Sequence, residues 1–122
     1  MKYGLTSQEL DSILNVFEKT PEVEKAVLFG SRAKGNFRPG SDVDIVVFGK
    51  NMSFDKFLTL IINLDELDLL QAIDLIKYEN IEDNKVIEHI KRVGKVLYER
   101  EGTKLDSTAQ CSSNKDTNNE NK

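Results

Sequence analysis

The apolar positions of this chain alternate between helical and extended spacing, which predicts a mixture of helices and strands. The first helix is expected to begin after Thr6, because Thr6 and Glu9 form a capping box, and to end before Pro21. A short helical turn is expected from Ser31 to Gly35. Three apolar runs predict strands over residues 23–29, 42–48 and 68–76.

Two more helices are predicted after the second strand. Ser53 can cap the first of them, with Asp55 in its opening turn. We expect its buried stripe to consist of Phe54, Leu58, Ile61 and Ile62. The last helix is predicted from about Asn84 to Arg92, with Gly94 as the residue just past its end. Residues 96–98 fit either a short edge strand or a continuation of this helix.

This order of elements indicates an α/β (α+β) fold in which helices pack on a mixed sheet of three to four strands. We expect one domain over residues 1–100. Residues 101–122 are almost entirely polar, with only Leu105, Ala109 and Cys111 as apolar residues. Such a segment cannot bury enough surface to offset its chain entropy, so we expect a disordered tail.

Composition and charge exclude several classes of protein. No apolar stretch approaches the roughly 18–20 residues of a membrane span, and the first residues lack the apolar segment of a signal peptide. The net charge of −4 argues against general nucleic-acid binding, which needs a basic face. A single cysteine, Cys111, cannot form an internal disulfide, so a reducing cytoplasm is the expected compartment.

The segment that joins the first two strands carries the most chemistry. The first strand ends at Gly30 and Ser31, whose backbone N–H groups and hydroxyl can bind phosphate oxygens. A basic loop follows, with Arg32, Lys34 and Arg38. Arg38 alone fits a solvated loop position. Together these features predict a phosphate-binding turn.

Two carboxylates follow ten residues after this turn. Asp42 and Asp44 are spaced i, i+2, so on a strand their side chains point to the same face. Like charges so close repel one another unless a cation screens them. Mg²⁺ prefers oxygen ligands and completes its shell with water and substrate phosphates. A solvated strand end is the simpler interpretation of such a pair alone, but the preceding Gly-Ser turn favours a metal-dependent site.

The pattern of Gly30-Ser31, ten residues, then Asp42-x-Asp44 resembles the signature of the DNA polymerase β-like nucleotidyltransferase superfamily. The short chain and the run Gly-Ser-Arg-Ala-Lys-Gly resemble its minimal nucleotidyltransferases, which are antitoxin partners of HEPN-domain toxins. The resemblance covers about residues 23–100.

The resemblance implies a third acidic residue on the adjacent strand, and Asp74, within an apolar run, matches that position. Asp68 is the competitor, at the start of the predicted strand, and Asp74 could also simply point to water. Asp42, Asp44 and Asp74 would then hold two Mg²⁺ ions, and Asp74 could take up the proton of the attacking hydroxyl. Gly30, Ser31 and Arg32 would bind the β- and γ-phosphates of ATP, with Lys34 as a helper.

The activity that the resemblance implies is transfer of AMP from ATP to a hydroxyl, a tyrosine of a HEPN-domain toxin with which the chain forms a hetero-oligomer. Two alternatives stay open: an antitoxin that neutralises its partner by contact alone, and a nucleotidyltransferase acting on a small molecule such as an antibiotic. The only histidine, His89, is expected at the surface or in helix packing.

Overall fold

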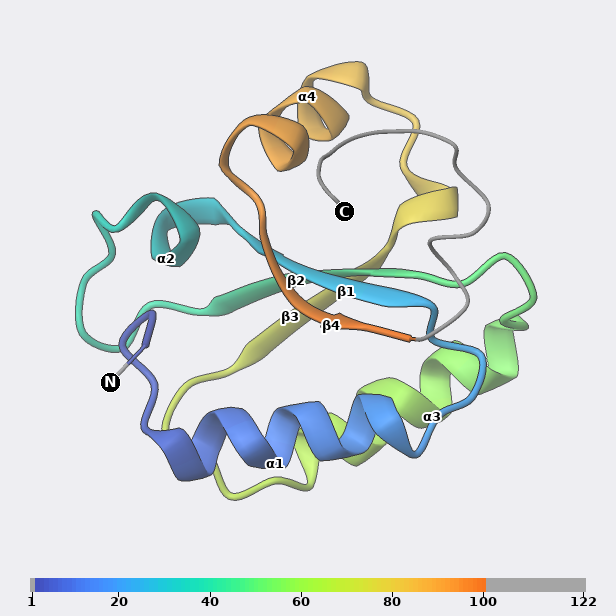
Figure 1. The fold of residues 1–122 in the computed structure, drawn as a ribbon, viewed down its shortest axis with the longest axis horizontal. Coiled ribbons are helices and arrows are strands. Elements are labelled where there is room, and N and C mark those ends of the chain that lie inside the picture. The colour runs from blue at the N-terminus through green and yellow to red at the C-terminus, as the bar shows by residue number, and fades with distance from the viewer. Residues whose placement is uncertain (1, 101–122) are drawn as a thin grey trace, which may run out of the picture.

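The computed structural model of this protein describes residues 2–100 (Figure 1). Its elements in chain order are α1 (Ser7–Glu18), β1 (Lys25–Phe29), α2 (Gly30–Lys34), β2 (Val43–Phe48), α3 (Phe54–Asp65), β3 (Ile73–Lys77), the 3₁₀ turn η1 (Tyr78–Asn80), α4 (Asn84–Val93) and β4 (Lys95–Glu99). The expected disordered tail, residues 101–122 with Cys111, lies outside the described residues. Within residues 2–100, no helix is long and apolar enough to cross a membrane.

The strands form one mixed sheet in the order β3-β2-β1-β4. Strand β1 pairs antiparallel with β2 on one side and with β4 on the other, while β2 and β3 run parallel. A parallel pair needs a crossover connection, and α3 supplies it between β2 and β3. The predicted mixed α/β sheet is therefore confirmed, and residues 96–98 belong to an edge strand.

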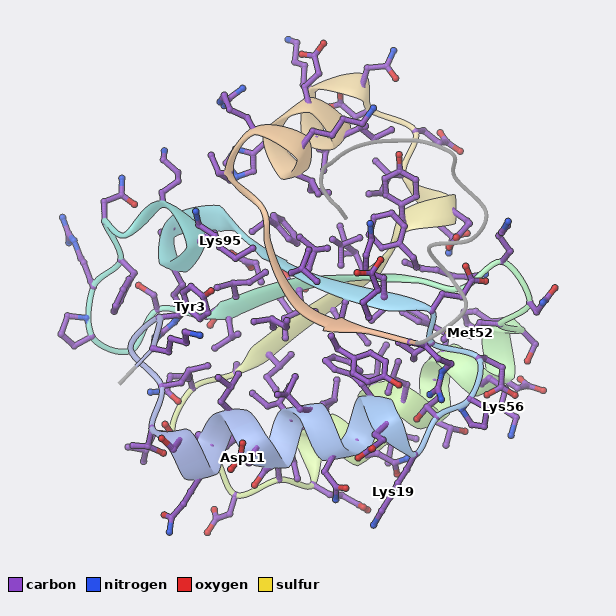
Figure 2. All side chains as sticks on the ribbon, in the orientation of Figure 1. Tyr3, Asp11, Lys19, Met52, Lys56 and Lys95 are labelled. Atoms are coloured by element: carbon purple, nitrogen blue, oxygen red, sulfur yellow. The ribbon has the colours of Figure 1, made fainter. Side chains whose placement is uncertain are left out.

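Helices cover both faces of this sheet. Figure 1 shows α1 and α3 on one side and α4 on the other. Strand β2 alternates between them: Ile45 and Val47 pack in the cluster that includes α1 and α3, and Val46 packs with Ile90 of α4. Side chains fill both spaces between sheet and helices (Figure 2). Because β2 lies between β1 and β3, its position is fixed from all sides.

The predicted helix caps are confirmed. The Thr6 N–H donates to Glu9 Oε1 at 2.9 Å, and the Glu9 N–H donates to Thr6 Oγ1 at 3.0 Å. The Lys56 N–H donates to Ser53 Oγ at 3.2 Å at the start of α3. Each cap satisfies a backbone donor that a helix start would otherwise leave to water, which explains where these helices begin.

The expected buried stripe of α3 is wrong. Phe54, Leu58 and Ile62 are 70%, 41% and 55% exposed, whereas Leu60 and Leu64 are buried in the core. Of the four residues expected to be buried, only Ile61 packs partly against the core. The helix is apolar on two faces, so spacing alone does not tell which face meets the sheet. The exposed row formed by Phe54, Leu58 and Ile62 is called the α3 outer row below.

The start of one strand and the conformation of Gly94 also differ from expectation. Strand β3 begins at Ile73 rather than residue 68, and Leu70 in the preceding segment is 92% exposed. Gly94 ends α4 with a φ of −59°, outside the left-handed region expected for a residue past a helix end. A Cβ at Gly94 would collide with the Ile90 carbonyl and lie 2.7 Å from Val27 Cγ1. Gly94 therefore permits close approach of α4 to β1.

We expect Leu60→Ala to lower the free energy of unfolding by about 2–5 kcal/mol, because it leaves a cavity in the core. Leu58→Ala, two positions away on the same helix, is the matched control and should change it by less than about 1 kcal/mol. Urea unfolding followed by circular dichroism measures both values. Equal losses for the two variants would contradict the burial of one face of α3.

Candidate active site

The three predicted carboxylates lie together at the start of β2 and on β3. Asp44 of β2 is the direct neighbour of Asp74 in the parallel register with β3. Asp42 stands two residues before Asp44, just ahead of the strand. Asp42 and Asp74 are exposed and Asp44 is half-buried. Asp68, the competing candidate, lies five residues before β3 and has no place in this register.

The electrostatic environment of Asp44 is unfavourable for a carboxylate. Burial raises the pKa of Asp44 above its ordinary value, and repulsion from Asp74 and then from Asp42 raises it further. The charge of Arg32, and that of His89 whenever its imidazole is protonated, oppose this effect only in part. A cation bound among these three groups would relieve the repulsion, so the site fits Mg²⁺ in charge and ligand type.

The protein side chains alone do not form a ready-made metal cage. Among residues 2–100, no group of three or more potential ligands converges closely enough to hold an ion by itself. Mg²⁺ usually keeps several water ligands and is held by one or two carboxylates together with substrate phosphates, so an ion bound here would need ligands besides these side chains.

The Gly-Ser turn directly adjoins these carboxylates. Phe29, the last residue of β1, pairs with Asp44 across the sheet, and Gly30 follows. Gly30 has a φ of +75°, and a Cβ there would collide with Asp44 Oδ2. Glycine is thus required at this position both by the backbone conformation and by the carboxylate packed against it. Ser31, half-buried, follows at once in α2.

Arg32 is held by main-chain carbonyl groups. Its side chain is only 2% exposed. Nη1 donates to the Tyr3 carbonyl at 2.7 Å, and Nε and Nη2 donate to the Ser41 carbonyl at 3.2 and 2.8 Å. The guanidinium also lies over the Phe37 ring, 4.8 Å from its centroid. Arg32 therefore fixes the residue before Asp42 and the N-terminal segment, where Figure 2 labels Tyr3.

The predicted contacts of the basic loop with phosphate stay predictions. Lys34 and Arg38 are both exposed. The backbone N–H of Arg38 donates to Ser41 Oγ at 3.0 Å, which closes the turn ahead of Asp42. Arg32 contributes a positive charge near Asp44, but its donors point to carbonyl groups.

His89 has a role in the site geometry that the sequence did not reveal. The backbone N–H of Gly30 donates to His89 Nε2 at 3.2 Å. The imidazole also meets the Phe29 ring edge-on, with centroids 6.2 Å apart and planes at 82°. Its position on α4 is compatible with the expected helix packing, but its partner lies 59 residues away in the sequence. No local pattern could have identified that pairing.

A hollow lies elsewhere, on the α1 side of the sheet. Asp11, Asn15, Glu18 and Tyr98 are among the residues that line it. Tyr98 packs with the core cluster of α1 and α3, so this hollow is separate from the carboxylates on the α4 side.

Fold and site together define a class of protein. Residues 11–103 match the family model described as polymerase beta, nucleotidyltransferase. The chain belongs to this nucleotidyltransferase family. Protein adenylyltransferase MntA of Aphanizomenon flos-aquae is 33% identical over 106 residues, which cover 80% of this chain and 71% of the relative.

Solved structures show the same fold. A toxin–antitoxin structure with AMP-PNP has a TM-score of 0.61 at 22% identity and covers 79% of this chain and 78% of the matched chain. A tri-AMPylated HEPN toxin of Shewanella oneidensis in complex with an MNT antitoxin has a TM-score of 0.58 at 19% identity, with 79% and 74% covered.

We expect Asp44→Asn to raise the Tm near neutral pH. Because the folded-state pKa of Asp44 is raised, folding favours its protonated form. The stability that this form contributes is complete below about pH 4 and is lost as pH rises through the folded pKa. The gain from the substitution should therefore shrink on acidification towards about pH 4. Thermal melts followed by circular dichroism across this range measure it.

Asp68→Asn, an exposed carboxylate outside the group, is the matched control and should not show this pattern. Added MgCl₂ should raise the Tm of the unchanged protein more than that of Asp44→Asn, because binding to the folded state stabilises it. A lower Tm for Asp44→Asn near neutral pH would contradict the repulsion argued above.

Proposed function

We propose that this protein transfers AMP from ATP to a tyrosine hydroxyl of a HEPN-domain toxin and thereby acts as its antitoxin. The observation that carries the proposal is the group Asp42, Asp44 and Asp74 beside the Gly30 turn, in a member of a nucleotidyltransferase family. The curated relative is a protein adenylyltransferase, and a structural neighbour contains an AMPylated HEPN toxin.

Asp42, Asp44 and Asp74 would hold two Mg²⁺ ions. When bound, Mg²⁺ would neutralise negative charge on the reacting phosphate and on the attacking and leaving oxygens. The raised pKa of Asp44 and the charges of its two neighbours support a site that is incomplete without cations.

In the reaction, the acceptor hydroxyl attacks the α-phosphorus, a new P–O bond forms, and the bond to the β-phosphate breaks to release pyrophosphate. Asp74 would take up the proton of the hydroxyl. Its exposure supports this role, because an acceptor side chain on another protein has to reach it.

Gly30 and Ser31 would bind the β- and γ-phosphates, with the exposed Lys34 as a helper. Arg32, assigned to the same phosphates from the sequence, donates three hydrogen bonds to carbonyl groups and is almost fully buried. We therefore infer that Arg32 contributes positive charge nearby and holds the segment before Asp42, rather than contacting the nucleotide directly.

The partner would be a second protein in a hetero-oligomer. The α3 outer row supports binding to a protein surface, because exposed apolar residues in one row are uncommon on a chain that stays alone. We place the pair in the cytoplasm, in keeping with the single cysteine of the sequence.

Co-expression with a HEPN-domain partner tests the activity. We expect intact mass spectrometry to show the partner heavier by one or more AMP units when the unchanged protein is present. Asp74→Ala should still bind the partner but leave its mass unchanged, because proton uptake and metal binding are both impaired.

Asp68→Ala is the matched control and should modify the partner as the unchanged protein does. Parallel reactions with ATP, GTP, CTP and UTP identify the nucleotide. A partner that is inhibited by the unchanged protein in the presence of ATP and Mg²⁺, yet carries no added mass, would contradict the enzyme and favour an antitoxin that acts by contact alone.

A further inference from the structure

The hydrogen bond between Gly30 and His89 occupies a donor that the proposed function needs. The Gly30 N–H points to His89 Nε2 at 3.2 Å, in a partly buried position. Gly30 also adjoins the Asp44 carboxylate. The amide that would meet a phosphate oxygen is thus already paired with a side chain of α4.

The pairing determines the state of the imidazole. Because Nε2 accepts a hydrogen bond, it must present its lone pair, and the ring proton is on Nδ1. The edge-on contact with Phe29 orients the ring plane. His89 therefore reaches Gly30 as a neutral acceptor, held from two sides.

A phosphate oxygen and this nitrogen have the same hydrogen-bonding role. Ionised phosphate oxygens are acceptors, and a charged acceptor binds an amide N–H more strongly than a neutral one. One N–H cannot serve both acceptors at full strength. A nucleotide that takes the Gly30 amide must therefore displace His89 Nε2.

We propose that His89 is a positioning residue that occupies the Gly30 amide in the free protein and yields it to a phosphate of the incoming nucleoside triphosphate. This inference rests on the proposed function, and it adds a competitor within the protein that sets nucleotide affinity. The residue acts through Gly30 and touches none of the reacting atoms.

Substitutions at His89 separate competition from packing. His89→Phe keeps a ring against Phe29 but removes the acceptor, and His89→Gln keeps an acceptor of similar reach. We expect His89→Phe to bind AMP-PNP with Mg²⁺ about two- to tenfold more tightly, as expected when one neutral hydrogen bond no longer has to be broken. His89→Gln should stay close to the unchanged protein.

Isothermal titration calorimetry measures these affinities, and thermal melts show that the variants are folded. If the phenylalanine side chain does not fit, His89→Leu serves as a second variant that lacks a hydrogen-bond acceptor. With the HEPN-domain partner present as substrate, His89→Phe and His89→Leu should have a lower KM for ATP than the unchanged protein. Their kcat should stay nearly constant, because only the nucleotide-free state is changed. A merely structural role would not lower KM.

Nuclear magnetic resonance provides a test without any substitution. His89 is the only histidine of the chain, so its two imidazole ¹⁵N signals need to be assigned only to Nδ1 and Nε2. We expect saturating AMP-PNP with Mg²⁺ to shift the Nε2 resonance as its hydrogen bond to Gly30 is lost. An unchanged Nε2 resonance under saturating nucleotide would overturn the inference.

The outcomes distinguish the two proposals. If the unchanged protein does not bind AMP-PNP, both the proposed function and the role of His89 fail. If it binds the nucleotide, but His89→Phe and His89→Leu bind it equally well or more weakly, the proposed function stands and the inference about His89 is wrong.

Discussion

The repulsion between Asp44 and its two acidic neighbours is the constraint on which the site depends. Asp44 is paired with Asp74 by the parallel register of β2 and β3, and Asp42 lies two residues away. These charges cannot separate without breaking strand pairing. The sheet therefore holds an unfavourable group of carboxylates in place, and burial together with this repulsion raises the pKa of Asp44.

The opposite face of β2 explains why the sheet can sustain this arrangement. Val43, Ile45 and Val47 are fully buried against the α1 and α3 side. A shift of register by one residue would turn these side chains outward and Asp44 into the core. Burial of three apolar side chains thus determines where the carboxylate points. Arg32 adds a second restraint, through its hydrogen bonds to Ser41 just before Asp42.

Features that depend on local spacing could be predicted from the sequence. The capping box at Thr6, the Gly30 turn and the nearness of Asp42 to Asp44 each follow from residues a few positions apart. Asp74 could be chosen over Asp68 with the help of family resemblance, because an isolated charge in an apolar run marks a strand position. The register of β2 and β3 then brings Asp74 beside Asp44.

Features that depend on tertiary contacts could not be predicted. The buried face of α3 is set by its packing on the sheet, since the helix is apolar on two sides. Arg32 resembles a phosphate ligand in sequence, but its partners are carbonyl groups of Tyr3 and Ser41. The spacing of apolar residues in α4 does not indicate the contact of His89 with Gly30.

The free protein has two complementary deficits at one place. Its carboxylates repel one another, and the Gly30 amide is paired with a neutral nitrogen rather than an anion. An isolated metal ion could bind the carboxylates, and an isolated anion could bind the amide. A nucleoside triphosphate with bound Mg²⁺ carries positive and negative charge at adjacent positions, so it meets both at once.

Because the Asp44 carboxylate packs directly against Gly30, a metal among the carboxylates and a phosphate at the amide would also attract each other. The close packing of Gly30 on Asp44 would therefore favour the metal–nucleotide complex over either component.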